Sequence, residues 1–542
     1  MSNYHRLRVG EGGTDRMERT ELIAHLQAHV RAEVDTYLSQ RPLVEVASLD
    51  EMESLSRALF AGLVVVFFEV WSVVLERVAK DLALTCPCCG GRRKCKRRRG
   101  ALMKLKILGL ELNLPKLYLE CAHCAAPGLS VTKVLTGLSS GEASIELKLM
   151  ASYSAAKDSY GKAAADHKAH HGQELERTSV RRMALEVEGS AMEFAAVERA
   201  AALKKVSGEA RTIGVERLMV QGDGGSVRTG ELALCKPGDE GYGKTTAKTG
   251  KPRRKRVTQN REVITLDVRE PGQMQPDGLD VVVPCEAAEG QRAERILATA
   301  ARSGLGDNTQ VLGLGDLGSS LPKSFDEAFV GYNSIYSGDW KHVRDYVKGA
   351  AAVLEQSEGS TDNEGCDIES EFLDADRWQQ QMVEAIWKRD ERSRDRLLHQ
   401  AYKHRVAELP EWLERCPVHA LDSYVCNNWN RMNAAQFKQM DVDFVSARAE
   451  AQVRERTKKR FSVPGAWRQE NLEGKATLRA IIDEGSWERF RQWCRDRTMS
   501  LFQQKLVERL EQAMGEGRIS AKQVAKVLGQ DQTHSEIFGE AA

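Results

Sequence analysis

The stretch Arg217-Leu-Met-Val-Gln-Gly-Asp-Gly-Gly225 decides the fold, because an apolar run ends there in a Gly-Asp-Gly-Gly string around Asp223. A second apolar run, Gln310-Val-Leu-Gly-Leu314, leads into Gly-Asp-Leu-Gly around Asp316. Both runs have the composition of buried β-strands. Carboxylates at the ends of such strands project from a rigid sheet edge, where two or three can hold Mg²⁺ over a phosphodiester. A third acidic position, Glu450, precedes a basic stretch.

The length of 542 residues is too great for one core and predicts three to five units. The net charge is only +1, so no overall field marks a nucleic-acid partner. The basic residues are nevertheless clustered in three runs, which favours phosphate binding over the alternative of solvated faces. The candidate DNA contacts in these runs are Arg97, Arg98, Arg99, Lys251, Arg253, Arg254, Arg256, Lys458, Lys459 and Arg460.

The N-terminal sequence predicts a cytoplasmic protein. Residues 1–20 are polar and mixed in charge, so no secretory signal is expected. The most apolar stretch, Ala58–Leu75, contains Glu69 and lacks about 20 uninterrupted apolar residues, so it predicts a buried helix and no membrane partner. Twelve cysteines in a reducing compartment favour metal ligation over disulfides. The expected location is the bacterial cytoplasm, at the nucleoid.

Periodicity and cysteine spacing define the first segments. Leucine and valine recur every four residues over 20–39, and a second helix is predicted over 49–82, so residues 1–82 form a helical unit. Residues 83–135 carry two CxxC pairs joined by β-like segments, which is the arrangement of a zinc ribbon. Its predicted Zn²⁺ ligands are Cys86, Cys89, Cys121 and Cys124. The alternative, four reduced structural cysteines, leaves the paired spacing unexplained.

Residues 136–208 are predicted to be helical. Within them, a turn at His170-His171-Gly172 followed by Thr178–Arg182 is compatible with a DNA-binding helix-turn-helix. An ordinary helical hairpin has the same pattern, so both interpretations stay open.

Residues 209–357 change to an α/β pattern. Strands are predicted at Arg217–Gln221, Ser226–Ala233, Val263–Arg269, Leu279–Val283 and Gln310–Leu314, with another ending at Ile335-Tyr336. A helix at 291–302 precedes the fifth strand, and a further helix follows the last. Antiparallel strands followed by βα alternation is the order of an RNase H-like domain. The predicted fold class is therefore multidomain α/β, with this catalytic core interrupted by an all-α insertion.

The remaining segments complete that organisation. Residues 358–435 form the helical insertion, residues 436–470 form the second part of the core and carry Glu450, and residues 471–542 form C-terminal helices.

Many short strings in this order resemble the DDE transposases of bacterial insertion sequences, especially the ISKra-type enzymes. The resemblance covers roughly residues 80–490. Its strings are the paired cysteines, Gly222–Val227, the basic hairpin through Arg256, Gly315-Asp316, Asp339-Trp-Lys-His-Val343, Ser446-Ala-Arg-Ala-Glu450, Arg456, Gly465 and Trp467. Agreement in order and spacing across all of them makes the resemblance more specific than any single motif.

The resemblance implies that Asp223, Asp316 and Glu450 form the metal-binding triad. The chain departs from the family pattern at Leu317 and Ala447, where the family usually has Gly. Two other acidic residues stay open as the third ligand: Asp443 and Glu455. Two further residues either support the metal ligands and DNA or act as a helix cap and a partly buried histidine: Asp339 and His342.

The function implied is an active transposase that cleaves and joins DNA strands with two Mg²⁺ or Mn²⁺ ions. Its expected partners are double-stranded DNA, both terminal repeats and target, and further copies of itself in a dimer or larger oligomer. Two alternatives remain: a domesticated, inactive DNA-binding relative, and a structure-selective nuclease on the same fold.

Overall fold

The structure is a computed structural model of the chain. It describes residues 86–527 and isolated positions before residue 65. The residues not described within that range are 87, 125–127, 138–141, 208–212, 247–249, 274–277, 283–288, 357–373, 404–415, 453 and 455–468. The helices predicted over 20–39 and 49–82 therefore lie outside the described residues, apart from those isolated positions.

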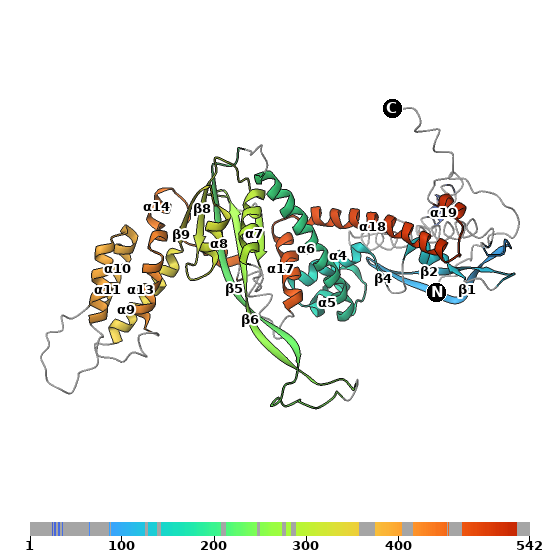
Figure 1. Cartoon of the computed structure of the whole chain (residues 1–542), viewed down its shortest axis with the longest axis horizontal. Coiled ribbons are helices and arrows are strands. Elements are labelled where there is room, and N and C mark those ends of the chain that lie inside the picture. Colours follow the sequence, from blue (N-terminus) through green and yellow to red (C-terminus); the bar gives the residue numbers. More distant parts are fainter. Residues whose placement is uncertain are drawn as a thin grey trace. The chain divides into compact units, whose positions relative to one another are not determined.

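Two compact units make up the chain, and Figure 1 labels their elements. The cysteine unit comprises Met1–Met150, Ala165–Leu175 and Cys494–Ala542. The sheet unit comprises Ala151–Ala164 and Glu176–Trp493. The chain as described is mixed α/β, as predicted. Among the described residues, no helix is long and apolar enough to cross a membrane.

A long antiparallel hairpin organises the cysteine unit. Strand β1 (Arg93–Ile107) pairs with β2 (Leu110–Cys121) through a turn in which Gly109 adopts φ 79°, a conformation that favours glycine. The short strands β3 (Leu129–Ser130) and β4 (Glu142–Ala143) flank this pair in the order β3-β2-β1-β4. The β-strands predicted between the two cysteine pairs are thus confirmed.

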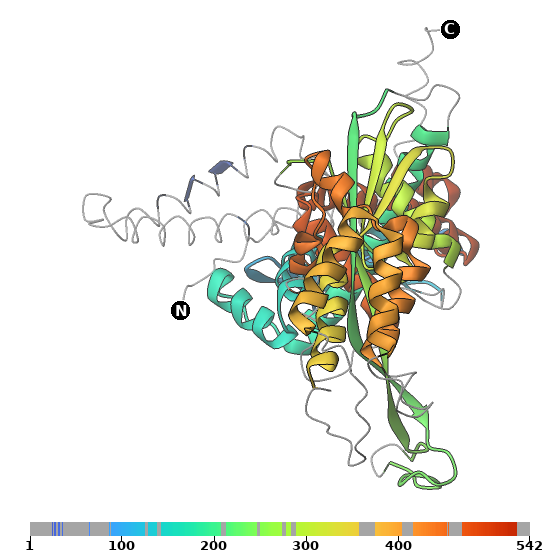
Figure 2. The ribbon, with the colours of Figure 1, turned by 90° about the vertical axis from the view of Figure 1, so that its left-hand side faces the viewer.

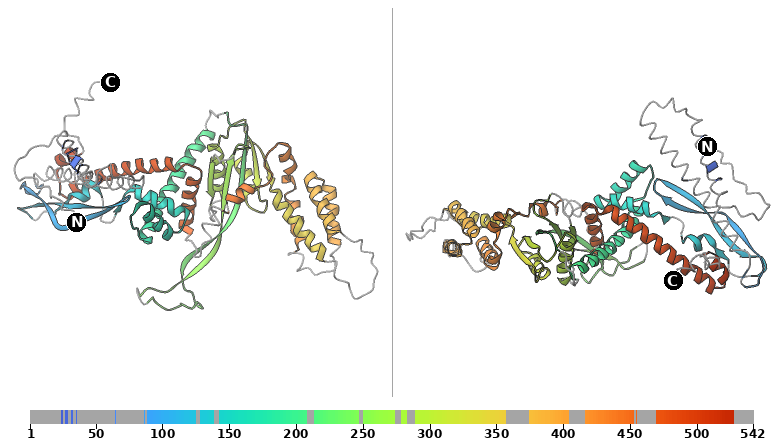
Figure 3. Two further views of the ribbon diagram at one scale, coloured as in Figure 1. Left: turned by 180° about the vertical axis from the view of Figure 1, so that it is seen from behind. Right: turned by 90° about the horizontal axis from the view of Figure 1, so that it is seen from above.

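The core of the cysteine unit lies between this hairpin and the C-terminal half of helix α18 (Trp487–Gly515), which Figure 3 shows as one long helix. Leu117 and Leu129 are buried together with Leu510. Two short helices, α3 (Val131–Thr136) and α19 (Ala521–Val527), contribute Val131, Leu135 and Val524 to that core.

The predicted helical character of residues 140–205 is confirmed. The helices are α4 (Ile145–Lys157), α5 (Tyr160–His171) and α6 (Arg177–Ser207). Helix α6 is 31 residues long and packs against α7 (Glu289–Arg302) and α17 (Gln469–Asp483) in the sheet unit. Its buried face therefore serves the core of that unit, and reading of DNA by this helix stays a prediction.

A five-stranded mixed sheet forms the centre of the sheet unit, in the order β7-β6-β5-β8-β9. Strand β5 (Arg217–Leu234) is antiparallel to β6 (Arg254–Arg269) and parallel to β8 (Gln310–Gly315). Strands β7 (Gly278–Val282) and β9 (Asn333–Gly338) form the edges. Strand β8 is buried almost throughout, which matches its uninterrupted apolar sequence and central position.

One strand differs from its prediction. The sequence predicted separate strands at Arg217–Gln221 and Ser226–Ala233, but β5 runs unbroken from Arg217 to Leu234. Its partner β6 pairs with it residue by residue through Gly222-Asp223-Gly224-Gly225. Glycine is a poor strand former, which is why the sequence indicated a break, yet the cross-strand ladder holds it extended.

The helices that follow β9 form a bundle. Helix α9 (Trp340–Gln356) packs against α10 (Ala375–Lys388) and α13 (Pro417–Asn427), and α11 (Glu391–Lys403) packs against both of those. Figure 2 shows these helices side by side. Their buried side chains include Trp378 and continue the core of the sheet. The bundle returns the chain to the sheet through α14 (Ala434–Gln439) and α15 (Ala447–Gln452).

Glycine in the middle of β8 is required by its packing. A Cβ added at Gly313 would lie 2.5 Å from a ring carbon of Tyr336 and 2.6 Å from one of Phe325. Both rings are buried. We expect Gly313→Ala to destabilise the sheet unit by about 1–3 kcal/mol, measured by chemical unfolding. The control is Gly349→Ala in α9, where no atom would lie within 4 Å and where alanine gains up to about 1 kcal/mol in a helix. Equal stability of the two variants would contradict the packing.

Candidate active site and metal centre

Three neighbouring strands carry Gly-Asp at the same level of the sheet, at the ends of β8 and β9 and within the longer β5. Gly222 of β5 pairs with Gly315 of β8, and Gly315 pairs with Gly338 of β9. The next residue in each strand is an aspartate: Asp223, Asp316 and Asp339. Adjacent strands lie about 4.8 Å apart, so parallel register places these three backbones side by side. They lie at the end of the sheet where β8 and β9 stop, which we call the sheet edge. The structure thus brings together the two predicted aspartates and adds a third.

Close packing explains why glycine precedes each aspartate. A Cβ on Gly315 would lie 2.7 Å from the carbonyl oxygen of Gly222 and 2.7 Å from the hydroxyl of Tyr336. At Gly222 it would collide with Leu321, and at Gly338 with Leu317. Larger residues would push the strands or these leucines apart. Glycine is therefore the residue that this packing admits immediately before each aspartate.

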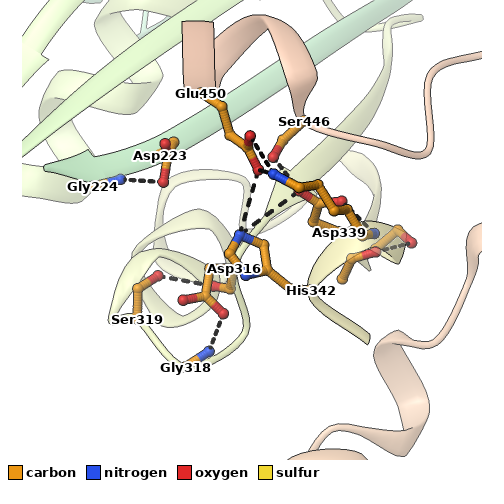
Figure 4. Close-up of polar contacts among 12 residues, drawn as sticks. Asp223, Gly224, Asp316, Gly318, Ser319, Asp339, His342, Ser446 and Glu450 are labelled. Carbon is orange, nitrogen blue, oxygen red and sulfur yellow. Dashed lines mark hydrogen bonds and ion pairs between the residues drawn. The ribbon is translucent and has the colours of Figure 1, made fainter. Parts of the chain in front are cut away.

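A candidate metal site lies beside this edge, formed by Asp339, His342 and Glu450. One potential ligand atom from each lies within 4.8 Å of the others. The Nε2 atom of His342 is 3.9 Å from Asp339 Oδ2 and 3.9 Å from Glu450 Oε1. Figure 4 shows Glu450 reaching from α15 toward His342 at the start of α9. Carboxylates and imidazole suit a divalent cation, so this group could hold one.

Lys341 neutralises part of the site's charge. Its ammonium donates hydrogen bonds of 2.7 and 2.6 Å to the two carboxylate oxygens of Glu450. These bonds raise the pKa of Lys341. The side chain is half exposed, so screening by water keeps this contribution to stability small.

The segment that carries Glu450 is fastened to the sheet at several points. Asp443 accepts hydrogen bonds from Arg269 at 2.5 Å and from Gln221 at 3.1 Å. Ser446 donates to the buried carboxylate of Asp339. Together these contacts fix the entry to helix α15. Asp443, the alternative third ligand, is thus engaged with Arg269 and lies outside the Asp339 group, whereas the other alternative, Glu455, lies outside the described residues.

Asp316 is held by its own turn and by the helical bundle. Its Oδ1 accepts the amide hydrogen of Gly318 at 2.9 Å and faces the hydroxyl of Tyr424 at 3.4 Å. Burial, with the nearby Asp316 charge, raises the pKa of Tyr424, so its hydroxyl stays protonated as a donor. Asp223 Oδ1 accepts the amide hydrogen of Gly224 at 2.8 Å. Both aspartates are half-buried and retain some access to solvent.

The residues that lie next to Glu450 in the structure differ from those predicted from the sequence. Asp223 and Asp316 lie side by side by register, but the tight group found among the described residues combines Glu450 with Asp339 and His342. The sequence treated those last two only as supporting residues and missed Lys341 and Ser446. A usable signal existed: Gly338-Asp339 follows a strand-like run, as Gly222-Asp223 and Gly315-Asp316 do.

The second candidate metal centre lies in the cysteine unit, where both predicted cysteine pairs converge. Cys86 Sγ is 3.6 Å from Cys124 Sγ, and Cys89 Sγ is 3.5 Å from Cys121 Sγ. Pairing of Arg93 with Cys121 at the open end of the β1–β2 hairpin brings the two CxxC turns together. Four sulfurs bound at about 2.3 Å to one Zn²⁺ would lie about 3.8 Å apart, so this group could bind zinc.

Backbone amides favour the thiolate form of two of these sulfurs, those of Cys86 and Cys121, whereas the pKa of Cys89 is raised. The amide of Cys89 lowers the pKa of Cys86 to about 6, and the amide of His123 lowers the pKa of Cys121. The His123 amide lies 3.3 Å from the Cys121 sulfur. A lowered pKa favours the thiolate, which is the form that binds metal.

The predicted DNA contacts fall into three groups. Lys251, Arg253, Arg254 and Arg256 are exposed on and beside the β5–β6 loop. Arg97–Arg99 lie in an irregular part of β1 whose side chains are not described. Lys458–Arg460 lie outside the described residues. Only the first group can therefore be placed in space.

Comparison of the chain with protein-family models and with curated proteins found no match. The functional conclusion therefore rests on the residues described above.

Zinc content offers a direct check of the cysteine group. We expect Cys121→Ser and Cys124→Ser each to lose about one equivalent of bound zinc, because a single missing thiolate opens the tetrahedral site. Metal analysis of the purified protein is the measurement. Cys88→Ser is the matched control, since Cys88 is exposed in the same turn but does not belong to the group. Full zinc retention in both ligand variants would exclude the four-thiolate site.

Proposed function

We propose that this protein is a DDE-type transposase that cleaves and joins DNA strands. The observation that carries the proposal is the row Asp223, Asp316 and Asp339 at one sheet edge, with Glu450 and His342 beside it. In that group Asp339 and Glu450 offer carboxylate oxygens within 4.8 Å of each other, and carboxylates this close favour a bound cation. Such an edge is suited to divalent metal chemistry on a phosphate ester.

The topology supports an RNase H-like core. Strands β7, β6 and β5 are antiparallel neighbours in reverse chain order, and β8 and β9 continue the sheet on the other side of β5 in parallel. That is the order of antiparallel strands followed by βα alternation expected of this fold. Three helices of the bundle, α10, α11 and α13, fall within residues 358–435, where the sequence predicted an insertion.

Each residue of the site has a defined role in this proposal. Asp223, Asp316 and Glu450 would hold two Mg²⁺ or Mn²⁺ ions, with Asp339 and His342 as further ligands or as groups that orient Glu450. When bound, the ions would activate the attacking oxygen and stabilise the leaving oxygen. Asp339 is fully buried. Its carboxylate accepts hydrogen bonds from the hydroxyl of Ser446 and the backbone amide of Lys341, and these two bonds hold it in one orientation.

The other features have places in the same proposal. The four cysteines would hold a structural zinc that fixes the hairpin of the cysteine unit. The exposed basic loop would contact double-stranded DNA, which includes the ends of the element and its target. The protein would act at the nucleoid as a dimer or larger oligomer, because two ends must be processed together.

Strand cleavage tests the active-site assignment. We expect Asp223→Asn, Asp316→Asn and Glu450→Gln each to reduce Mg²⁺-dependent nicking by about 10³-fold or more, because the ligands act as a unit. The substrate is a labelled duplex that carries the DNA bordering the gene. Glu327→Gln is the control, since Glu327 is an exposed carboxylate on α8 (Leu321–Ala328).

The outcomes separate the alternatives. Nicking by the wild type at any branched DNA, without preference for the bordering sequence, would replace the transposase with a nuclease. Binding without nicking would indicate an inactive relative. Nicking by Glu450→Gln but not by Asp443→Asn would move the third ligand to Asp443.

Salt dependence tests the basic loop. Neutralising Lys251, Arg253, Arg254 and Arg256 together should flatten the plot of log affinity against log salt by about 0.9 for each phosphate that the variant no longer neutralises. A matched set of four exposed cations on the helices serves as control: Lys323, Arg377, Lys388 and Arg396. An unchanged slope in the loop variant, or an equal change in both variants, would make the loop an ordinary solvated surface.

A further inference from the structure

Beyond Asp223, strands β5 and β6 leave the sheet and continue as a two-stranded arm. Strand β8 pairs with β5 only as far as Gly222, and β7 pairs with β6 only from Ile264 onward. The β5–β6 register nevertheless continues without a shift from Asp223 opposite Thr265 to Leu234 opposite Arg254. Figure 3 shows this arm extending away from the rest of the sheet.

The far end of the arm is strongly basic. Residues 231–257 contain eight Lys or Arg and three Asp or Glu. One acidic side chain, Asp239, is already paired with Lys255 at 2.6 Å. Arg253, Arg254 and Arg256 are exposed. This excess of positive charge is complementary to a phosphate backbone.

The tip also presents apolar surface on a formed loop. Tyr242 is 55% exposed and Leu234 is 57% exposed. Backbone hydrogen bonds of 2.8 Å from Arg253 to Lys244 and 2.9 Å from Thr246 to Lys251 hold the loop together. An exposed aromatic ring among cations is suited to packing against sugars or bases. The described residues of the tip thus offer a contact surface for DNA.

The length of the arm matches a period of DNA. Eleven residues separate Asp223 from Leu234 along β5. At about 3.3 Å per residue this is about 36 Å, and less if the ribbon coils. One turn of B-DNA is about 34–36 Å, or about 10 base pairs. A two-stranded β-ribbon is also narrow enough to enter the major groove.

We infer that the arm contacts duplex DNA about one helical turn from the bond that the active site cuts. The inference rests on the proposed function and specifies how its substrate is held. A DNA duplex turns the same face toward the protein once in every helical turn. An arm that lies along the duplex and spans one turn therefore reaches the DNA backbone on the face that also meets the candidate active site. The contact thereby sets the distance between the binding site and the cleaved bond.

Photocrosslinking measures that distance. A benzophenone amino acid in place of the exposed Leu234, at the end of the measured length, is irradiated on the labelled border duplex, and the crosslinked base is mapped against the Mg²⁺-dependent nick. In parallel, Fe²⁺ bound in place of Mg²⁺ is treated with peroxide, and the hydroxyl radicals formed cut the DNA next to the carboxylate site. This cut marks the position of the site even if the protein does not hydrolyse DNA. We expect the crosslink about 10 base pairs from both marks. The same amino acid at Val330, which is exposed before the start of β9, is the control and should give no crosslink there.

A shortened arm tests the length itself. Removing Gly230 and Glu231 with their partners Thr258 and Val257 deletes two paired levels and keeps the alternation of faces. The arm becomes about 7 Å shorter, which is about two base pairs of duplex. The crosslink should then move by that amount toward the nick, while the nick stays in place.

The position of the crosslink tests the inferred one-turn contact. A crosslink that is absent, scattered, or within about half a helical turn of the nick overturns it, as does an unchanged crosslink in a folded shortened variant. Failure of the proposed function has a different signature. A single crosslink with neither a nick nor an Fe²⁺ mark would keep the arm as a DNA contact and remove both the active site and the one-turn spacing.

Discussion

The close approach of β5, β8 and β9 at their glycine level is the constraint on which the candidate site depends. Gly315 lies so close to the Gly222 backbone and the Tyr336 hydroxyl that no larger side chain fits between these strands. The consequence is electrostatic as well as steric. Asp223, Asp316 and Asp339 follow these glycines on adjacent strands, and a nearby cation stabilises carboxylates placed in this way. In the described structure, Lys341 supplies one such charge next to Glu450.

Glu450 reaches this edge from a distant part of the chain. The aspartates are positioned by strand pairing, whereas Glu450 is positioned by hydrogen bonds and ion pairs. The bundle that separates it from Asp316 is tied back to β9 by Asn433, whose side chain donates a 2.8 Å hydrogen bond to the carbonyl of Tyr336. The amide of Trp340 donates to the carbonyl of Phe444 at 3.1 Å. The buried guanidinium of Arg269 then pairs with Asp443 just before α15, so removing Asp443 would leave a buried charge with poorer compensation.

The sequence predicted those parts of the fold that local patterns determine. Gln310–Leu314 is apolar over most of its length, and the structure confirms a buried central strand there. The CxxC spacing likewise predicted a four-cysteine group that the structure assembles. The continuity of β5 through Gly224-Gly225 could not be predicted, because it depends on pairing with β6 and not on local propensity. The same holds for Asp339, whose place beside Asp316 follows from strand register. The position of Glu450 depends on a six-residue helix and on contacts from remote residues, which no local pattern encodes.

A single strand connects the candidate metal site to the surface that we propose as the DNA contact. Asp223 lies in the middle of β5, and Leu234 lies at its end. Every residue between them is paired with β6, so the distance from the carboxylate to the tip is set by backbone geometry and not by a flexible linker. A linker of equal length would sample many separations and would lose that freedom on binding, whereas the paired ribbon has already lost it on folding. The glycines of β5 therefore have two structural roles. Gly222 allows the close approach of β8 and Leu321, and Gly224-Gly225 continue the pairing with β6 toward the tip.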